Sequence, residues 1–218
     1  SYNRVERLLK RGASEHICPN GVDMNRIAPY RTTINDVKVG VTACRLIKRK
    51  NLQPLIKAMQ YVDLHLQIVG DGPQREPLEA LTERYGLSDS VEFFGYLEDR
   101  ADVYAAMAEA DVFVLPSHAE GFGVSVAEAM AIGLPPIVSD IPVFHEVVGD
   151  AGVFVKHHAP KDIADGIRQL QDDPELTRRL SQEARRRIET NFTLSQTAHS
   201  YADAYEQITD GQSPKRRT

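Results

Sequence analysis

The chain has 218 residues, 42% of them hydrophobic and 26% charged, a composition typical of a globular protein with a sizeable core. Its net charge of −5 argues against a nucleic-acid-binding protein. Cys18 and Cys44 lack the spacing of a zinc site or a disulfide framework, and no apolar run approaches the ~20 residues of a membrane span. With no signal peptide at its start, we expect a cytoplasmic protein.

A helix is expected around residues 5–10, and because the chain starts with Ser1 inside this pattern, we expect it to be a piece of a longer protein. A tight turn at residues 19–23 follows. From there to residue 155, short β-branched runs alternate with helical patterns. The expected strands are Val37–Thr42, Leu64–Val69, Val91–Phe94, Val112–Leu115, Pro136–Ser139 and Gly152–Val155. The expected helices between them are Leu52–Met59, Gln74–Tyr85, Asp99–Ala108, Val124–Ile132 and Val143–Val147.

Three more helices are expected near residues 160–171, 174–189 and 194–208, and residues 210–218 read as a disordered tail. Strands separated by helices of this length predict βαβ crossovers. The fold class is therefore α/β, with a doubly wound, Rossmann-like parallel sheet and helices on both faces.

A glycine-rich turn with two carboxylates follows the fourth strand. Glu120 precedes Gly121 and Gly123, and Glu128 lies about one turn into the next helix. In such sheets ligands bind beyond the carboxyl ends of the strands, where helix N-termini offer free N–H groups to anions. Helical side chains lean toward the N-terminus, so both carboxylates can reach one phosphorylated ligand. The alternative is that both are solvated.

A basic segment follows the first strand and faces the same edge of the sheet. It contains Arg45, Lys48, Arg49 and Lys50. Arginine offers a planar fork to phosphate oxygens and lysine a mobile charge. Since no Asp-x-Asp clamp for a metal-bound diphosphate occurs, Arg45, Lys50 and a helix N-terminus would neutralise a diphosphate, and we expect no metal.

Other functions fit the sequence less well. Gly70-Asp71-Gly72-Pro73 lacks the third glycine of a dinucleotide fingerprint, and no P-loop occurs. Glu120 and Glu128 could form a glycosidase pair, but they lie beside phosphate donors. His118 could contact a ligand, although a structural or solvated role is favoured, and His157-His158 reads as solvated.

Several motifs, in the same order, resemble the C-terminal, donor-binding domain of glycosyltransferase family 4, a retaining family with the GT-B fold. They cover about residues 15 to 155. The matching segments are residues 19–23, Arg45-Leu46 with Lys50-Asn51, 69–73, 91–97, Ser117 through Glu128, and Glu146-Val147-Val148 before Ala151-Gly152. Two segments depart from the family: Cys44 replaces a usual glycine, and Ile141-Pro142 replaces a frequent Gly-Gly.

The resemblance implies that the ligand is a nucleoside-diphosphate sugar and assigns the site residues. Arg45, Lys50 and Glu120 would be the catalytic residues, the first two on the diphosphate and Glu120 on the donor sugar. The backbone of Gly121, Phe122, Gly123 and Val124 would lie near sugar and phosphate, and Glu128 would bind the ribose. Gly95, Tyr96 and Leu97 would lie against the base.

The resemblance also implies an organisation. Residues 1–35 would be an opening helix and interdomain segment, 36–190 the nucleotide-sugar-binding domain, 191–209 a helix crossing to an absent N-terminal domain, and 210–218 the tail. That absent domain would supply the hexosyl acceptor and any peripheral membrane association, so the chain alone should bind nucleotide weakly and transfer no sugar. The alternatives are a non-catalytic nucleotide-sugar-binding module, or a sugar-nucleotide epimerase or glycogen-phosphorylase-like protein of GT-B architecture.

Overall fold

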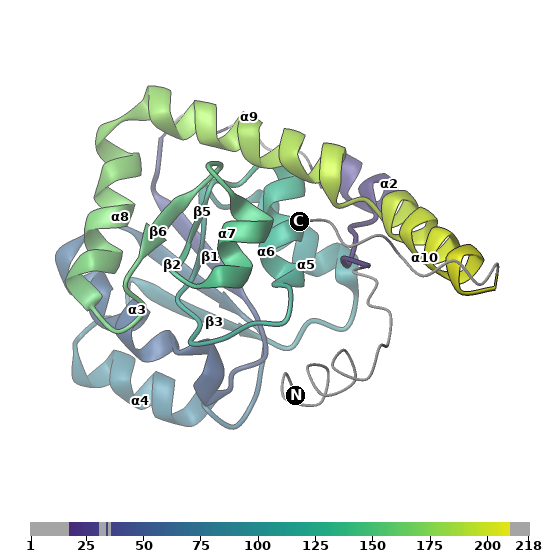
Figure 1. The fold of residues 1–218 in the computed structure, drawn as a ribbon. Coiled ribbons are helices and arrows are strands. Elements are labelled where there is room, and N and C mark those ends of the chain that lie inside the picture. Colours follow the sequence, from purple (N-terminus) through teal and green to yellow (C-terminus); the bar gives the residue numbers. More distant parts are fainter. Residues whose placement is uncertain (1–17, 31–33, 35, 210–218) are drawn as a thin grey trace.

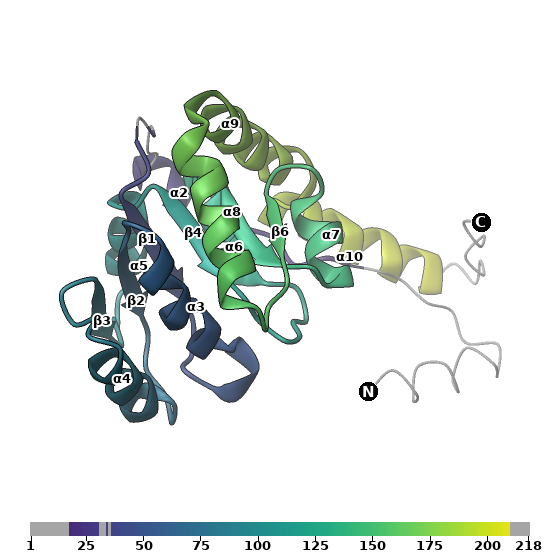
Figure 2. The same ribbon diagram turned by 90° about the vertical axis from the view of Figure 1, so that its left-hand side faces the viewer.

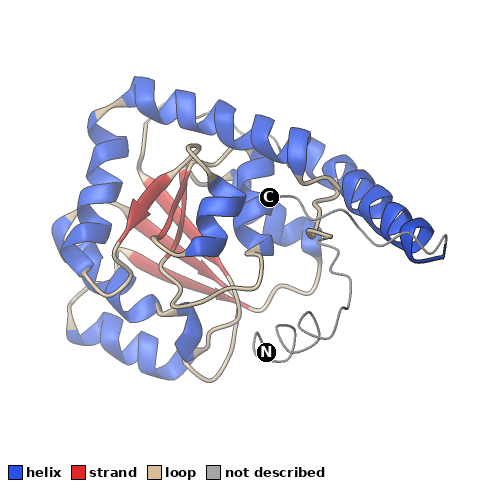
Figure 3. Cartoon of the chain, in the orientation of Figure 1, coloured by secondary structure: helices blue, strands red, loops and turns tan. Residues whose placement is uncertain are grey.

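The computed structural model describes residues 18–30, 34 and 36–209. The helix expected near residues 5–10 and the tail after residue 209 lie outside them. Within the described residues, six parallel strands form one sheet in the order β3-β2-β1-β4-β5-β6. Figure 3 shows the strands at the centre of the body with helices around them. The strands are β1 (Val39–Ala43), β2 (His65–Val69), β3 (Val91–Gly95), β4 (Val112–Leu115), β5 (Pro136–Ser139) and β6 (Val153–Val155).

Helices cover both faces of this sheet. On one face α3 (Leu52–Ala58) packs against α4 (Arg75–Arg84) and α8 (Pro160–Asp172), and α3 and α8 lie side by side in Figure 2. On the other face α6 (Val124–Ile132) packs against α5 (Arg100–Ala108) and α9 (Pro174–Asn191). The remaining helix of the wound part is α7 (Pro142–Val148), between β5 and β6. The predicted fold class is confirmed.

The order of the strands reverses between β1 and β4. From β1 the chain winds outward to β2 and β3, and from β4 it winds the other way to β5 and β6. The segments that follow β1 and β4 therefore diverge at the carboxyl edge of the sheet, which is where open α/β sheets bind ligands. Both predicted functional segments start at this switch point.

Helix α6 lies at the centre of the molecule. Its residues from Val126 to Ile132 are all buried, as are all four residues of the neighbouring strand β4. A helix that is hydrophobic around its whole circumference must be covered on every side, which α5, α9 and the sheet accomplish here. The N-terminal end of α6 lies at the carboxyl edge of the sheet, where the site is expected.

The first described residues are attached to the junction of the last two helices. Val22 N donates to Phe192 O at 2.8 Å, and Leu194 N donates to Val22 O at 3.0 Å. A short helix, α2 (Met24–Ile27), and the turn η1 (Ala28–Tyr30) follow. From this junction α10 (Leu194–Thr209) extends away from the body (Figure 1), with Leu194 and Tyr201 about half exposed. Among the described residues, no helix is both long and apolar enough to traverse a bilayer.

Candidate functional site

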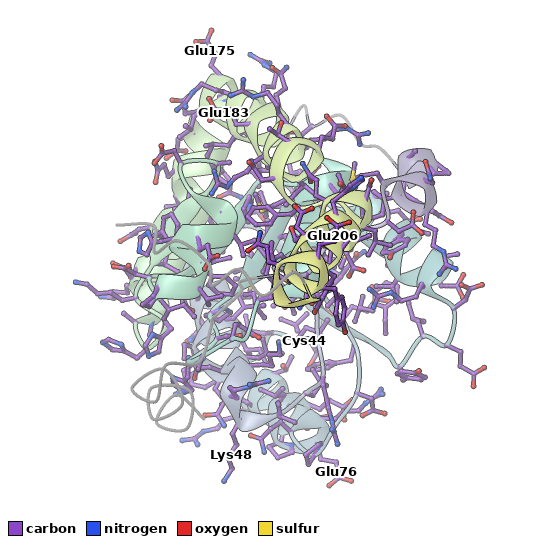
Figure 4. The ribbon with its side chains drawn as sticks, turned by 45° about the vertical axis from the view of Figure 1, so that its right-hand side comes forward. Cys44, Lys48, Glu76, Glu175, Glu183 and Glu206 are labelled. Carbon is purple, nitrogen blue, oxygen red and sulfur yellow. The ribbon has the colours of Figure 1, made fainter. Side chains whose placement is uncertain are left out.

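The site lies where β1 and β4 end next to each other. The segment after β1 carries Arg45 and the 3-10 turn η2 (Lys48–Lys50), and the segment after β4 carries residues 117–123. Arg45 is exposed at the edge of a cavity. Lys48, labelled in Figure 4, is exposed and lines neither of the two cavities described below. The basic segment therefore directs only part of its charge toward the site.

Asn51 holds the two segments together. Its backbone has a φ of 56°, in the left-handed region that asparagine tolerates better than most residues. Its Nδ2 donates to Pro116 O at 3.1 Å and to His157 O at 2.7 Å. His118 N adds a bond to Arg49 O at 2.9 Å. These contacts fix the position of Lys50, the neighbour of Asn51.

Lys50 and Glu120 form an ion pair across the switch point. Lys50 Nζ lies 2.7 Å from Glu120 Oε1, and their side chains are 13% and 6% exposed. Ser117 Oγ donates to the same oxygen at 2.7 Å. Neither contact uses Oε2 of Glu120, so this oxygen can accept a hydrogen bond from a ligand hydroxyl.

The turn after Glu120 directs the start of α6 into the site. Gly123, the N-cap, has a φ of 85°, and a Cβ there would lie 2.7 Å from Cε1 of the buried Phe144. Only glycine meets both conditions without strain. The cap has no side-chain hydrogen bond to the first N–H groups of the helix. These groups are the usual anion donors at a helix N-terminus.

Glu128 is the second carboxylate and is 4% exposed. Its Oε1 accepts hydrogen bonds from Tyr104 Oη at 2.9 Å and from Arg100 Nη2, both on α5. The guanidinium of Arg100 also lies over the Tyr104 ring, 5.5 Å from its centroid. As at Glu120, neither contact uses Oε2.

Two cavities open along this edge. The first, of about 390 Å³, extends from the segment after β1 to the segment after β3 and includes Arg45, Tyr96 and Leu97 in its wall. The second, of about 380 Å³, includes Lys50 and Glu120. It is also lined by Gly121, Phe122, Gly123 and Val124. Glu128 lines both cavities.

All but one of the predicted site residues line these cavities. The exception is Gly95, whose carbonyl accepts a hydrogen bond from Gly70 N at 2.7 Å. A Cβ on Gly95 would lie 2.9 Å from Nη1 of Arg75, so this glycine accommodates a neighbouring side chain. Its position serves the packing of the β2 and β3 ends.

Cys44 is half-buried between the cavities. Burial raises the pKa of its thiol to about 11, with Lys50 acting in the opposite direction. The thiol is therefore neutral near pH 7, which makes it a poor nucleophile.

The rings of His118, His157 and His158 lie close together next to the basic segment. The ring of His157 lies 4.8 Å from that of His118 and 5.2 Å from that of His158. Loss of hydration, with the two neighbouring rings, lowers the pKa of His157. His118 and His158 are exposed, as the sequence suggested, whereas His157 is half-buried and carries the carbonyl that Asn51 binds. No group of three or more His, Cys, Asp or Glu side chains in the described part of the chain is arranged to hold a metal.

The sequence reasoning missed Arg100, Tyr104 and the role of Ser117. Arg100 and Tyr104 lie one helical turn apart at the start of α5, and α5 begins at the same carboxyl edge of the sheet. The four-residue spacing that puts both on one face of α5 was visible in the sequence. What it could not reveal is that this face meets Glu128.

Comparison with known proteins gives one family. The model of the glycosyl transferases group 1 family matches residues 31–187. The lipopolysaccharide core biosynthesis glycosyltransferase LpsD of Rhizobium meliloti (strain 1021) is 33% identical over 174 residues, which are 78% of this chain and 50% of LpsD. The chain spans about half the length of the curated relatives it matches.

Two solved structures resemble the fold. Sucrose-phosphate synthase from Thermosynechococcus elongatus superposes with a TM-score of 0.82 at 26% identity, covering 96% of this chain and 57% of that one. Anabaena HepE, solved in complex with UDP and glucose, gives a TM-score of 0.76 at 24% identity, covering 86% of this chain and 55% of that one. In both cases the shared part is a little over half of the larger protein.

Proposed function

The chain belongs to the glycosyl transferases group 1 family, and on that premise we propose that it is the donor-binding half of a retaining hexosyltransferase that uses a nucleoside-diphosphate sugar. The observation that carries the proposal is the arrangement of the polar groups: a carboxylate and a lysine, a helix N-terminus, and a second carboxylate along one edge. A nucleotide sugar has the matching order of a sugar, a diphosphate and a ribose.

Glu120 is the proposed ligand of the donor sugar. The ion pair with Lys50 and the bond from Ser117 hold its Oε1, which leaves Oε2 to accept from a sugar hydroxyl. The backbone N–H groups from Gly121 to Val124 line the same cavity and would contact sugar and phosphate.

Arg45, Lys50 and the N-terminus of α6 are the proposed ligands of the diphosphate. In a retaining transfer the sugar–phosphate bond stretches toward an oxocarbenium-like state and negative charge develops on the leaving diphosphate. Cations and fixed N–H dipoles directed at that charge stabilise the transition state more than the ground state. We propose that these groups neutralise the diphosphate without a metal.

Glu128 is the proposed ligand of the ribose, and the first cavity would hold the base. Tyr96 and Leu97 line this cavity beside Glu128. A structural neighbour with the same fold, HepE, was solved with UDP and glucose, which is consistent with a nucleotide-sugar ligand. We assign the chain to the C-terminal half of a family 4 enzyme, with the acceptor bound by an N-terminal domain that α10 would approach.

Titration calorimetry of the 218-residue chain with UDP, GDP and ADP, and with their 2′,3′-dideoxy analogues, tests the proposal. One of the three diphosphates should bind, weakly, and better than its dideoxy analogue. Glu128→Gln should lower the affinity for that diphosphate about tenfold, as expected for loss of a hydrogen bond to a charged group. It should also abolish the preference for the ligand with ribose hydroxyls.

The surface variant Glu76→Gln on α4 removes the same charge away from both cavities and should bind as the wild type does (Figure 4). If Glu128→Gln kept the preference for ribose over dideoxyribose, the ribose assignment would be wrong. If none of the diphosphates bound, the donor-site proposal would be wrong as a whole.

A further inference from the structure

Arg100 and Glu128 lie at the boundary between the two cavities. Both residues line each cavity, together with Ala43, Cys44 and Ser125. A ligand that occupies both cavities at once must therefore pass the ion pair between Arg100 and Glu128. This requirement applies to the nucleotide sugar proposed above, whose base and sugar belong to different cavities.

The two members of the ion pair differ in freedom. The Glu128 side chain is 6% exposed and is also held by the Tyr104 hydroxyl. The Arg100 side chain is 52% exposed and belongs to the first residue of α5, where Asp99 caps the helix through Ala101 N. The backbone under Arg100 is thus fixed while its guanidinium has room to turn. Of the two partners, Arg100 is the one that can leave.

The charge of the cavity lining favours movement of Arg100 when an anionic ligand binds. Among the described residues that line the two cavities, three side chains are cationic and four are anionic. They are Arg45, Lys50 and Arg100 against Asp71, Glu98, Glu120 and Glu128. Lys50 and Arg100 are both paired with site carboxylates. An anionic diphosphate therefore binds more favourably if a cation exchanges its carboxylate partner for the phosphate oxygens. Arginine can offer these oxygens a bidentate fork.

We propose that Arg100 changes partners when ligand binds: the ribose hydroxyls take its place at Glu128, and the released guanidinium turns to the diphosphate. This inference rests on the proposed donor site and adds a residue to it. In the free protein Arg100 competes with the ribose, and in the complex it binds the phosphates. Its two effects on affinity therefore have opposite signs.

The opposite signs allow a test with Arg100→Ala and two ligands that share a base, a nucleoside and its diphosphate. Uridine with UDP, guanosine with GDP and adenosine with ADP are titrated, by calorimetry for the diphosphates and by NMR for the nucleosides. Loss of this ion pair, whose arginine is half-exposed, should tighten nucleoside binding about threefold, and loss of a phosphate contact should weaken diphosphate binding about tenfold. Arg100→Lys should recover part of the diphosphate affinity.

Arg84→Ala removes the same charge from the end of α4, outside both cavities, and should leave both affinities unchanged. If Arg100→Ala shifted nucleoside and diphosphate affinity in the same direction while Glu128→Gln still weakened the diphosphate, the exchange of partners would be overturned and the donor site would stand. Absence of binding by the wild-type chain to any of the three diphosphates would overturn both.

Discussion

Lys50→Met is the most informative single change in the site, because it separates the stabilising role of the ion pair from its role in binding. The substitution keeps the length of the side chain and leaves Glu120, 6% exposed, without its cation. Breaking a buried ion pair on one side typically costs about 3–5 kcal/mol. Since Ser117 still donates to Glu120 and the carboxylate borders a cavity, we expect a loss of about 2–4 kcal/mol in the free energy of unfolding.

The matched control is the double variant Lys50→Met/Glu120→Gln, which removes both charges at nearly constant volume. Replacing a whole buried pair is often neutral, so this variant should unfold within about 1 kcal/mol of the wild type. For a chain of this size the single variant should melt roughly 5–15 °C lower. Urea unfolding followed by circular dichroism measures the unfolding free energy of each variant, and heating followed by the same signal gives its melting temperature. A single variant as stable as the wild type, or a double variant as unstable as the single one, would refute the reasoning.

Both variants lack the lysine, so both should bind the preferred nucleoside diphosphate at least about tenfold more weakly, whatever their stability. Gly123→Ala should cost about 2–4 kcal/mol in unfolding free energy, because it combines a left-handed φ with a clash against Phe144. A Cβ on Gly121 meets nothing within 4 Å, so Gly121→Ala should change stability by less than about 0.5 kcal/mol. Equal losses of the two variants in urea unfolding would contradict this account of the turn. The lowered pKa of His157 means that the folded state binds a proton less readily than the unfolded chain, so this residue costs stability as the pH falls below the ordinary value of 6.5. Between pH 7.5 and 5.5 the melting temperature should therefore fall less in His157→Gln than in the wild type. The control His199→Gln, which changes an exposed histidine on α10, should behave as the wild type does. Parallel pH profiles of the two variants would count against this role of His157.

Most elements of the fold were predictable because each is encoded by neighbouring residues. Strands β4 and β5 begin and end as predicted, since a β-branched run and a following proline or polar residue define them locally. Strand β1 was predicted from Val37 but starts at Val39. The reason is not local: the carboxylate of Asp111 accepts from the N–H groups of Lys38 and Val39 at 2.9 and 2.8 Å, and pairing begins there.

The same distinction holds for the site. Lys50, Glu120 and Glu128 could be assigned to one edge because each follows the end of a predicted strand, and the topology of a doubly wound sheet brings those ends together. The partners of these residues could not be assigned. Whether Arg100 faces solvent or Glu128 depends on how α5 packs against α6, which is decided by side chains distributed over both helices.

The burial of α6 has a consequence for how this scaffold can diversify. Because α6 is covered on all sides, we expect its amides to exchange with solvent mainly through global unfolding, so that Glu128 is held by one of the most stable elements of the domain. Changes within α6 would be selected against through stability before they could alter recognition. New specificities therefore arise more readily at the periphery of the cavities, at positions such as Tyr96 and Glu98, whose side chains are exposed and whose substitution costs little stability.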